Sequence, residues 1–129
     1  MSQSEISHSN VAVWFEIPAA DFERAVNFYQ TVLQIKLREE MMGPLRMAVF
    51  PHAGEAVSGA IVQGGDFRPG ATGSVVYLNA GDDLARPLAR VAATGGKTVV
   101  PKTLITEEIG YFAHILDSEG NRVGLHSLK

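Results

Sequence analysis

Two polar residues within apolar strands, Glu16 and His114, are the strongest candidates for chemistry in this chain. Strand residues alternate between two faces, so Glu16 shares a face with Trp14, two positions away. A carboxylate beside a large aromatic ring can be shielded from water, as a general acid or base requires. The alternative is that Glu16 pairs with an arginine at the sheet surface or at a subunit contact.

His114 lies in a second apolar segment and shares a face with Phe112. An imidazole titrates near neutral pH and could move a proton at that position. The alternative is a hydrogen-bonded structural histidine among apolar neighbours. Glu16 and His114 are therefore the candidate catalytic residues.

Several other side chains suit the binding of a small organic molecule, because they combine aromatic contact area with a few polar groups. Tyr77 and Asn79 lie two positions apart and should share one strand face. Ser127 ends the last strand, and the adjacent His126 should take the opposite face. A serine nucleophile has no support, because the sequence contains no Gly-x-Ser-x-Gly motif. The predicted ligand-binding residues are Trp14, Tyr77, Asn79, Phe112 and Ser127.

The composition argues against several classes of protein. Eleven basic and fourteen acidic residues in 129 leave a net charge of −3, without the positive excess typical of nucleic-acid or membrane-surface binding. The absence of cysteine excludes disulfides, thiolate metal sites and a cysteine nucleophile. No segment resembles a signal peptide or a spanning helix of about 20 apolar residues. We expect a soluble cytoplasmic protein with no nucleic-acid or membrane partner, and a flexible tail over residues 1–9.

The first half of the chain has one strand, one helix and three further strands. Residues 11–17 are rich in β-branched and aromatic residues, and Asp21 can cap the helix that follows. Apolar residues then recur every three or four positions over residues 22–33, which predicts an amphipathic helix. The remaining strands are predicted over residues 35–42, 45–50 and 57–63.

The second half repeats this order after a linker. Residues 64–73 contain four glycines and a proline, as linkers do. A strand over 74–79 precedes a helix that Pro87 should delay until Asp83 or later and that Gly95-Gly96 should end. The rest is a strand over 98–105 and a closing hairpin over 111–128. We therefore predict one domain over residues 10–129, with module one at about 10–63, the linker at 64–73 and module two at 74–128.

Four short motifs in this order resemble the vicinal oxygen chelate superfamily of glyoxalases, bleomycin resistance proteins and extradiol dioxygenases. The resemblance spans roughly residues 10–128. It implies an α+β fold in which two βαβββ modules form an open, cup-shaped mixed sheet. Such a cup is often completed by a second subunit, so a homodimer is expected. The motifs are Trp14-Phe-Glu-Ile-Pro18, Arg24-Ala25 before Phe28-Tyr29, Gly95-Gly96 and Asp117-Ser-Glu-Gly-Asn121.

Metal-dependent members of this superfamily take ligands from the first and fourth strands of each module. The resemblance places those positions on Trp14, Val62, Val75 and Ser127, none of which is a usual ligand. If each ligand position is moved by one or two residues along its strand, the candidate ligands become Glu16, Gln63, Tyr77 and His126. Because the usual ligands are missing, we expect a protein that binds a small organic molecule in the cup without a metal or other cofactor. The alternatives are a metal-dependent lyase, isomerase or dioxygenase with shifted ligands, a metal-free proton-transfer enzyme, and a purely structural role in a dimer.

Overall fold

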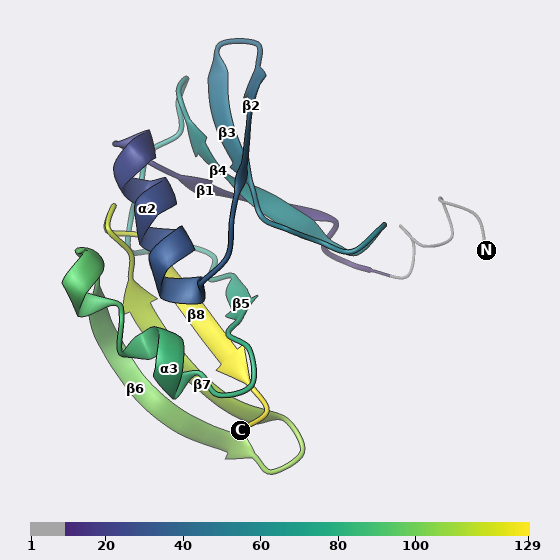
Figure 1. The fold of residues 1–129 in the computed structure, drawn as a ribbon, viewed down its shortest axis with the longest axis vertical. Helices are drawn as coiled ribbons and strands as arrows, with labels where there is room; N and C mark the ends of the chain where they lie inside the picture. Colours follow the sequence, from purple (N-terminus) through teal and green to yellow (C-terminus); the bar gives the residue numbers. More distant parts are fainter. Residues whose placement is uncertain (1–9) are drawn as a thin grey trace.

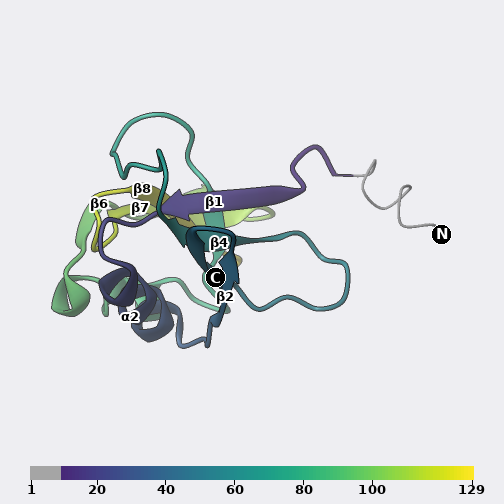
Figure 2. The same cartoon turned by 90° about the horizontal axis from the view of Figure 1, so that it is seen from above.

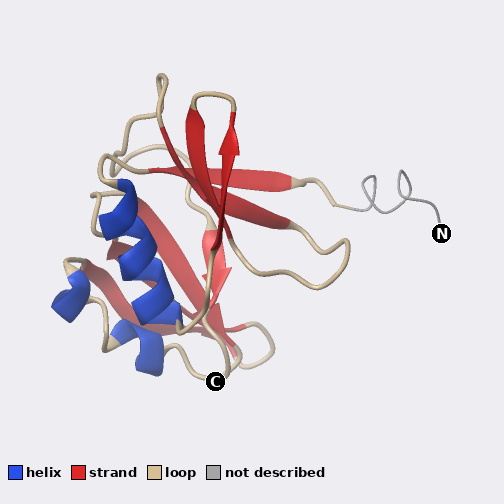
Figure 3. Cartoon of the chain, turned by 45° about the horizontal axis from the view of Figure 1, so that its top comes forward, coloured by secondary structure: helices blue, strands red, loops and turns tan. Residues whose placement is uncertain are grey.

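The computed structural model describes residues 10–129 as two four-stranded sheets with the helices gathered beside them (Figures 1 and 3). The predicted tail, residues 1–9, lies outside the described residues. The first sheet has the order β1-β4-β3-β2, with β1 at Trp14–Pro18, β4 at Ser58–Gln63, β3 at Leu45–Val49 and β2 at Arg38–Met42. The second sheet has the order β5-β8-β7-β6, with β5 at Tyr77–Asn79, β8 at Arg122–Ser127, β7 at Gly110–Leu116 and β6 at Lys97–Thr106.

Each sheet repeats the same pairing scheme. The first strand of each module runs parallel to the fourth, and the other neighbours are antiparallel. The predicted α+β fold of two βαβββ modules with open sheets is therefore confirmed. No helix within residues 10–129 is long and apolar enough to cross a membrane.

Helix α2, Phe22–Leu33, begins and packs as the sequence predicts. The side chain of Asp21 accepts a hydrogen bond from the Arg24 backbone N–H at 3.1 Å, which satisfies one free donor of the first turn. The apolar face enters the main core, which both modules share. Its buried members are Phe22, Ala25, Val26, Phe28, Tyr29 and Val32.

The predicted helix of the second module is split into two short pieces. Helix α3 covers Ala85–Leu88, and the 3₁₀ helix η1 covers Ala92–Thr94. Between them, the bonds from Arg90 N–H and Val91 N–H reach back only three residues, so regular α-helical pairing is lost. The helical segment ends at Gly95, whose φ of 95° suits a residue without a side chain.

Each sheet has a face that packs on the helices and an opposite face, here called the open face. On the open face of the first sheet, four residues are buried in a small apolar cluster: Met47, Val49, Ala60 and Val62. Phe67 of the linker packs against this cluster, and the linker passes on the side of the sheet opposite α2 (Figure 2). Side chains therefore fill part of the cup that the first module was expected to offer.

A buried carboxylate, Asp117, joins the closing hairpin of module two to the helix of module one. Its Oδ2 accepts the Tyr29 hydroxyl at 2.6 Å, and its Oδ1 accepts the backbone N–H groups of Glu119 and Asn121. Burial, together with the charge of Asp117, raises the pKa of Tyr29 well above its ordinary value. The Tyr29 hydroxyl therefore stays protonated and remains a donor to the carboxylate.

A second carboxylate of the same turn, Glu119, binds the start of α2. Its Oε1 accepts the backbone N–H groups of Ala20 and Asp21, and Arg24 forms an ion pair with it at 2.7 Å. Burial alone would raise the pKa of Glu119, but the bonds from Arg24, Asp21 and Ser118 together lower it. The Asp-Ser-Glu-Gly-Asn turn thus holds the two modules together.

Candidate functional site

Three hollows border β5 and the residues beside it, with volumes of about 690, 620 and 570 Å³. Tyr77 and Asn79 line the first two, and Trp14 lines the second and third. The second hollow therefore lies between the other two, where β1 of one module approaches β5 of the other. Three of the five predicted ligand-binding residues line this second hollow, and a fourth, Ser127, lines the first.

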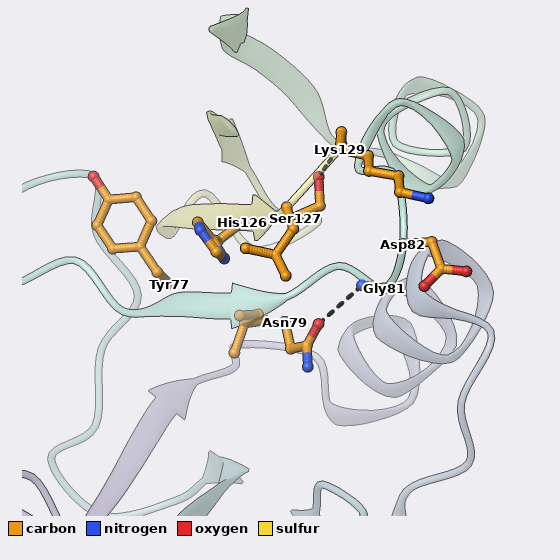
Figure 4. A pocket seen from close by; sticks show the side chains of 9 residues that line it. Tyr77, Asn79, Gly81, Asp82, His126, Ser127 and Lys129 are labelled. Atoms are coloured by element: carbon orange, nitrogen blue, oxygen red, sulfur yellow. Dashed lines mark hydrogen bonds between the residues drawn. The ribbon is translucent and has the colours of Figure 1, made fainter. Parts of the chain in front are cut away.

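Tyr77 and Asn79 are exposed on either side of the buried Leu78, so they share one strand face as expected. Both line the first hollow (Figure 4). The Asn79 side-chain oxygen accepts the Gly81 N–H at 3.0 Å, which leaves its amide NH₂ without a partner in the described part of the chain. Tyr77 and Trp14 are 50% and 43% exposed. A ligand at the junction can therefore contact two aromatic rings and one amide donor.

The orientation predicted for Ser127 is wrong. Its hydroxyl accepts the Leu84 N–H at 2.9 Å and donates to the Lys129 carbonyl at 2.7 Å, so it faces the helices. His126 takes the open face instead, and its Nε2 lies 2.6 Å from the Ile109 carbonyl. Ser127 borders the first hollow, but both of these hydrogen bonds engage its hydroxyl in the packing of the second module's helical segment.

His114 lies on the open face of the second sheet and hydrogen-bonds through both ring nitrogens. Arg122 Nε donates to Nδ1 at 2.9 Å, and Nε2 lies 2.6 Å from the Tyr77 hydroxyl oxygen. We call Arg122, His114 and Tyr77 the imidazole bridge. Phe112 lies beside it, 5.5 Å from the His114 ring and 6.5 Å from the Tyr77 ring between centroids, and so confirms the predicted shared face of Phe112 and His114.

The imidazole bridge has one consistent arrangement of hydrogens. A guanidinium has only donors, so Nδ1 of His114 must be the unprotonated acceptor. The neutral ring then carries its hydrogen on Nε2 and donates it to the Tyr77 oxygen. Burial, and then the positive charge of Arg122, lowers the pKa of His114, which favours this neutral form.

We predict that His114 titrates below the ordinary histidine value of about 6.5 and carries its hydrogen on Nε2. As pH falls, the unfolded chain binds this proton first. The stability that the neutral bridge contributes is therefore fully present above about pH 6.5 and is lost as pH falls toward the folded pKa. Long-range ¹H–¹⁵N spectra over a pH series, with the signals assigned from His114→Gln, measure both properties. A midpoint at or above 6.5, or a hydrogen on Nδ1, would contradict the bridge.

Glu16 shares its face with Trp14, as predicted, but is exposed to solvent. Its Oε2 lies 3.3 Å from the Trp14 indole nitrogen, a long hydrogen bond, and no arginine pairs with it in residues 10–129. Arg68 and Arg122 line the same hollow as Glu16. The expected shielding from water is absent, so Glu16 can contact a ligand but lacks the environment of a general acid or base.

The donor set does not fit the divalent metal that the superfamily resemblance implies. Of the four shifted ligand candidates, Glu16, Tyr77 and His126 lie on open faces. The fourth, Gln63, uses its side-chain amide to hydrogen-bond the backbone at the start of α2. Within the described residues, no three His, Asp or Glu side chains gather closely enough to hold a metal ion. An imidazole or carboxylate cluster aimed at one point is required, so we derive no step through a metal.

Two residues of the site were missed from the sequence, Arg122 and Gly124. Both lie on the open face of β8, opposite Leu116 and His114 of β7. The Tyr77 ring covers Gly124 so closely that an added Cβ would lie 2.3 Å from Tyr77 Cδ2. Alternation from His126 would have identified both residues, had that histidine been assigned to the open face.

Comparisons with known proteins agree with this architecture. The sequence profile of the Glyoxalase/Bleomycin resistance protein/Dioxygenase superfamily matches residues 11–125. Comparison with curated protein sequences finds no significant match.

Solved structures with the same fold include enzymes and a binding protein. TnmS3, an antibiotic binding protein from Streptomyces sp. CB03234, is 22% identical with a TM-score of 0.61, over 92% of this chain and 97% of that one. Glyoxalase I from Leishmania major is 13% identical with a TM-score of 0.65, over 92% and 87% of the two chains. A glyoxalase I variant from Zea mays is 17% identical with a TM-score of 0.63, over 90% of this chain. The present chain spans only 45% of the maize protein.

Proposed function

The chain belongs to the Glyoxalase/Bleomycin resistance protein/Dioxygenase superfamily, and from that membership we propose that it binds a small organic molecule without a metal ion. The ligand occupies the junction of β1 and β5, against Trp14, Tyr77 and Asn79. The observation that carries this proposal is the second hollow, about 620 Å³ in volume, which these three side chains line together. A concave site lined by aromatic rings with a few polar groups is typical of small-molecule binding.

The chemistry of the junction supports binding over catalysis. His114 is held by hydrogen bonds at both ring nitrogens, so neither nitrogen is free to take a proton from a ligand. Glu16 is solvent-exposed. The likeness in fold to TnmS3, which is described as an antibiotic binding protein, makes antibiotics one set of ligands to test.

The single tryptophan of the chain, Trp14, provides a direct test. A panel of flat aromatic metabolites and antibiotics is titrated while Trp14 fluorescence and the melting temperature are followed. We expect at least one compound to change the fluorescence and raise the melting temperature. Asn79→Ala should weaken that compound about 3- to 10-fold by removing one neutral hydrogen bond, whereas Asn27→Ala, on the exposed surface of α2, should not. The absence of any responding compound would reject the proposal.

We also propose that two copies associate in the cytoplasm and that each completes the other's site. Large apolar side chains are exposed close to the junction and at the edge strand β2, and unpaired strand edges favour association. Multi-angle light scattering should give twice the mass of 13.9 kDa, and a monomer at all concentrations would contradict it. The exposed residues are Val11, Val13, Trp14, Met41, Met42 and Val57.

A further inference from the structure

The imidazole bridge leaves hydrogen-bond donors, and no acceptors of comparable strength, facing the open side of the second sheet. Because His114 Nε2–H already occupies the Tyr77 oxygen as an acceptor, the hydroxyl hydrogen of Tyr77 must point elsewhere. Within residues 10–129 it has no protein acceptor. The terminal nitrogens of Arg122 also have no partner there. Tyr77 borders the first and second hollows and Arg122 the third, so a neutral donor and a cationic donor lie on the two sides of the His114 ring.

The charged side chains near Arg122 also favour a negatively charged ligand. The hollow that Arg122 lines also contains Arg68 and Glu16, which gives two positive side chains and one negative one. Within residues 10–129 the Arg68 guanidinium bonds the backbone carbonyls of Gly65 and Phe67 and no acidic side chain, so no carboxylate of this part of the chain neutralises its charge. A ligand with a negative oxygen is favoured, and a cationic ligand is disfavoured.

The surroundings of these donors are aromatic. The rings of Tyr77, Phe112 and His114 contact one another, with centroids 5.4 to 6.5 Å apart. Because Gly124 has no side chain, the Tyr77 ring can lie directly on the backbone of β8. This surface complements a flat ring more closely than a flexible aliphatic chain.

We infer that the ligand is a flat aromatic acid, whose carboxylate or phenolate oxygen accepts hydrogen bonds from Tyr77 and Arg122. This inference rests on the proposed function and specifies the class of molecule bound. Arg122 provides the charge, because a guanidinium donates in a fixed plane to acidic oxygens. His114 does not touch the ligand in this arrangement and is a positioning residue that sets the direction of the Tyr77 hydrogen.

The test compares 2-naphthoate with its neutral analogue 2-naphthamide, which has the same ring and nearly the same shape. Binding is measured by NMR titration, following the aromatic signals of Tyr77 and His114 and, in the variants that lack one of them, those of Phe112, whose ring contacts both. We expect the acid to bind at least 10-fold more tightly than the amide, because charge-assisted hydrogen bonds are lost with the amide. Arg122→Gln should reduce the preference to within about 3-fold, and Tyr77→Phe should reduce it partly. Arg86→Gln, an exposed arginine of α3, and Tyr111→Phe should leave it unchanged.

Two substitutions of His114 separate positioning from simple packing. In His114→Gln, the side-chain amide can still accept from Arg122 and donate to Tyr77, so the acid preference should be retained. In His114→Leu it can do neither, and the preference should fall as far as in Tyr77→Phe even if the melting temperature is unchanged. Equal preference in the two variants would show that His114 does not position the hydroxyl.

The outcomes distinguish this inference from the proposed function. If amide and acid bind equally, the acid-specific inference is overturned while small-molecule binding stands. If neither probe shifts the Tyr77 or His114 signals up to its solubility limit, the inference is overturned as well. The failure of the whole ligand panel to affect Trp14 would instead remove the proposed function on which the inference depends.

Discussion

Asp117→Ala should lower the free energy of unfolding by about 3 to 4 kcal/mol, the largest loss that we expect from a single polar residue of this protein. Asp117 is 3% exposed and accepts hydrogen bonds from the Tyr29 hydroxyl, the Asn121 amide and two backbone N–H groups. Removing the carboxylate leaves the buried Tyr29 hydroxyl without an acceptor, which costs more than the bond itself contributed. Urea unfolding at neutral pH measures the loss.

The size of the effect should follow the number of acceptors that remain. Asp117→Asn keeps one acceptor oxygen and should lose about 2 kcal/mol, and Tyr29→Phe, which removes one donor, should lose about 1 to 2 kcal/mol. Asp66→Ala, on the exposed linker, is the matched control and should stay within about 0.5 kcal/mol of the parent. Equal stability of Asp117→Ala and Asp66→Ala would show that the turn does not hold the modules together.

The order of elements could be predicted from the sequence because local signals and the fold agree. Asp21 predicts the cap of α2, the spacing of Phe22, Ala25 and Phe28 predicts its buried face, and both are confirmed. For the second module the sequence predicted one continuous helix, whereas the structure has two short helical pieces. Its residues have helical spacing, but Pro87 and the glycines at 95 and 96 leave too short a segment for regular pairing throughout.

The resemblance placed a ligand position on Ser127, but the two modules differ by one residue in the connection that precedes it. The structure pairs Val49 with Ala60 in module one and His114 with Gly124 in module two. The connection between the third and fourth strands is therefore one residue shorter in module two. By strand register His126, and not Ser127, therefore takes the open-face position that Val62 takes in module one. Because strand residues alternate, a slip of one residue reverses every side chain of β8.

That reversal also explains why the imidazole bridge could not be predicted. Once Arg122 is assigned to the helix face, it cannot meet His114 on the open face, and Gly124 has no apparent function. The face of β8 depends on the length of a turn that has no hydrophobic pattern of its own. The candidate residues Tyr77, Phe112 and His114 were identified from their types, but their mutual contacts needed the register.

Gly124→Ala should separate the site from the stability of the fold. The new Cβ would lie 2.3 to 2.8 Å from three atoms of the Tyr77 ring, closer than packed side chains allow. Tyr77 is half exposed, so its ring can swing outward while the sheet remains intact. We expect the free energy of unfolding to change by less than about 1 kcal/mol, whereas the affinity for an aromatic acid should fall about 10-fold or more.

A double substitution tests whether Gly124 acts through Tyr77. In the Tyr77→Ala background no ring remains to be displaced, so adding Gly124→Ala should lower the affinity for the aromatic acid little further. If the double variant loses as much binding free energy as the two single variants together, Gly124 acts on binding by another route. We expect the effects of the two substitutions on binding to be coupled, because Gly124, Tyr77 and His114 occupy neighbouring positions on three adjacent strands. The absence of a side chain on the last strand is then what allows the tyrosine to reach the histidine and present its hydroxyl to the ligand.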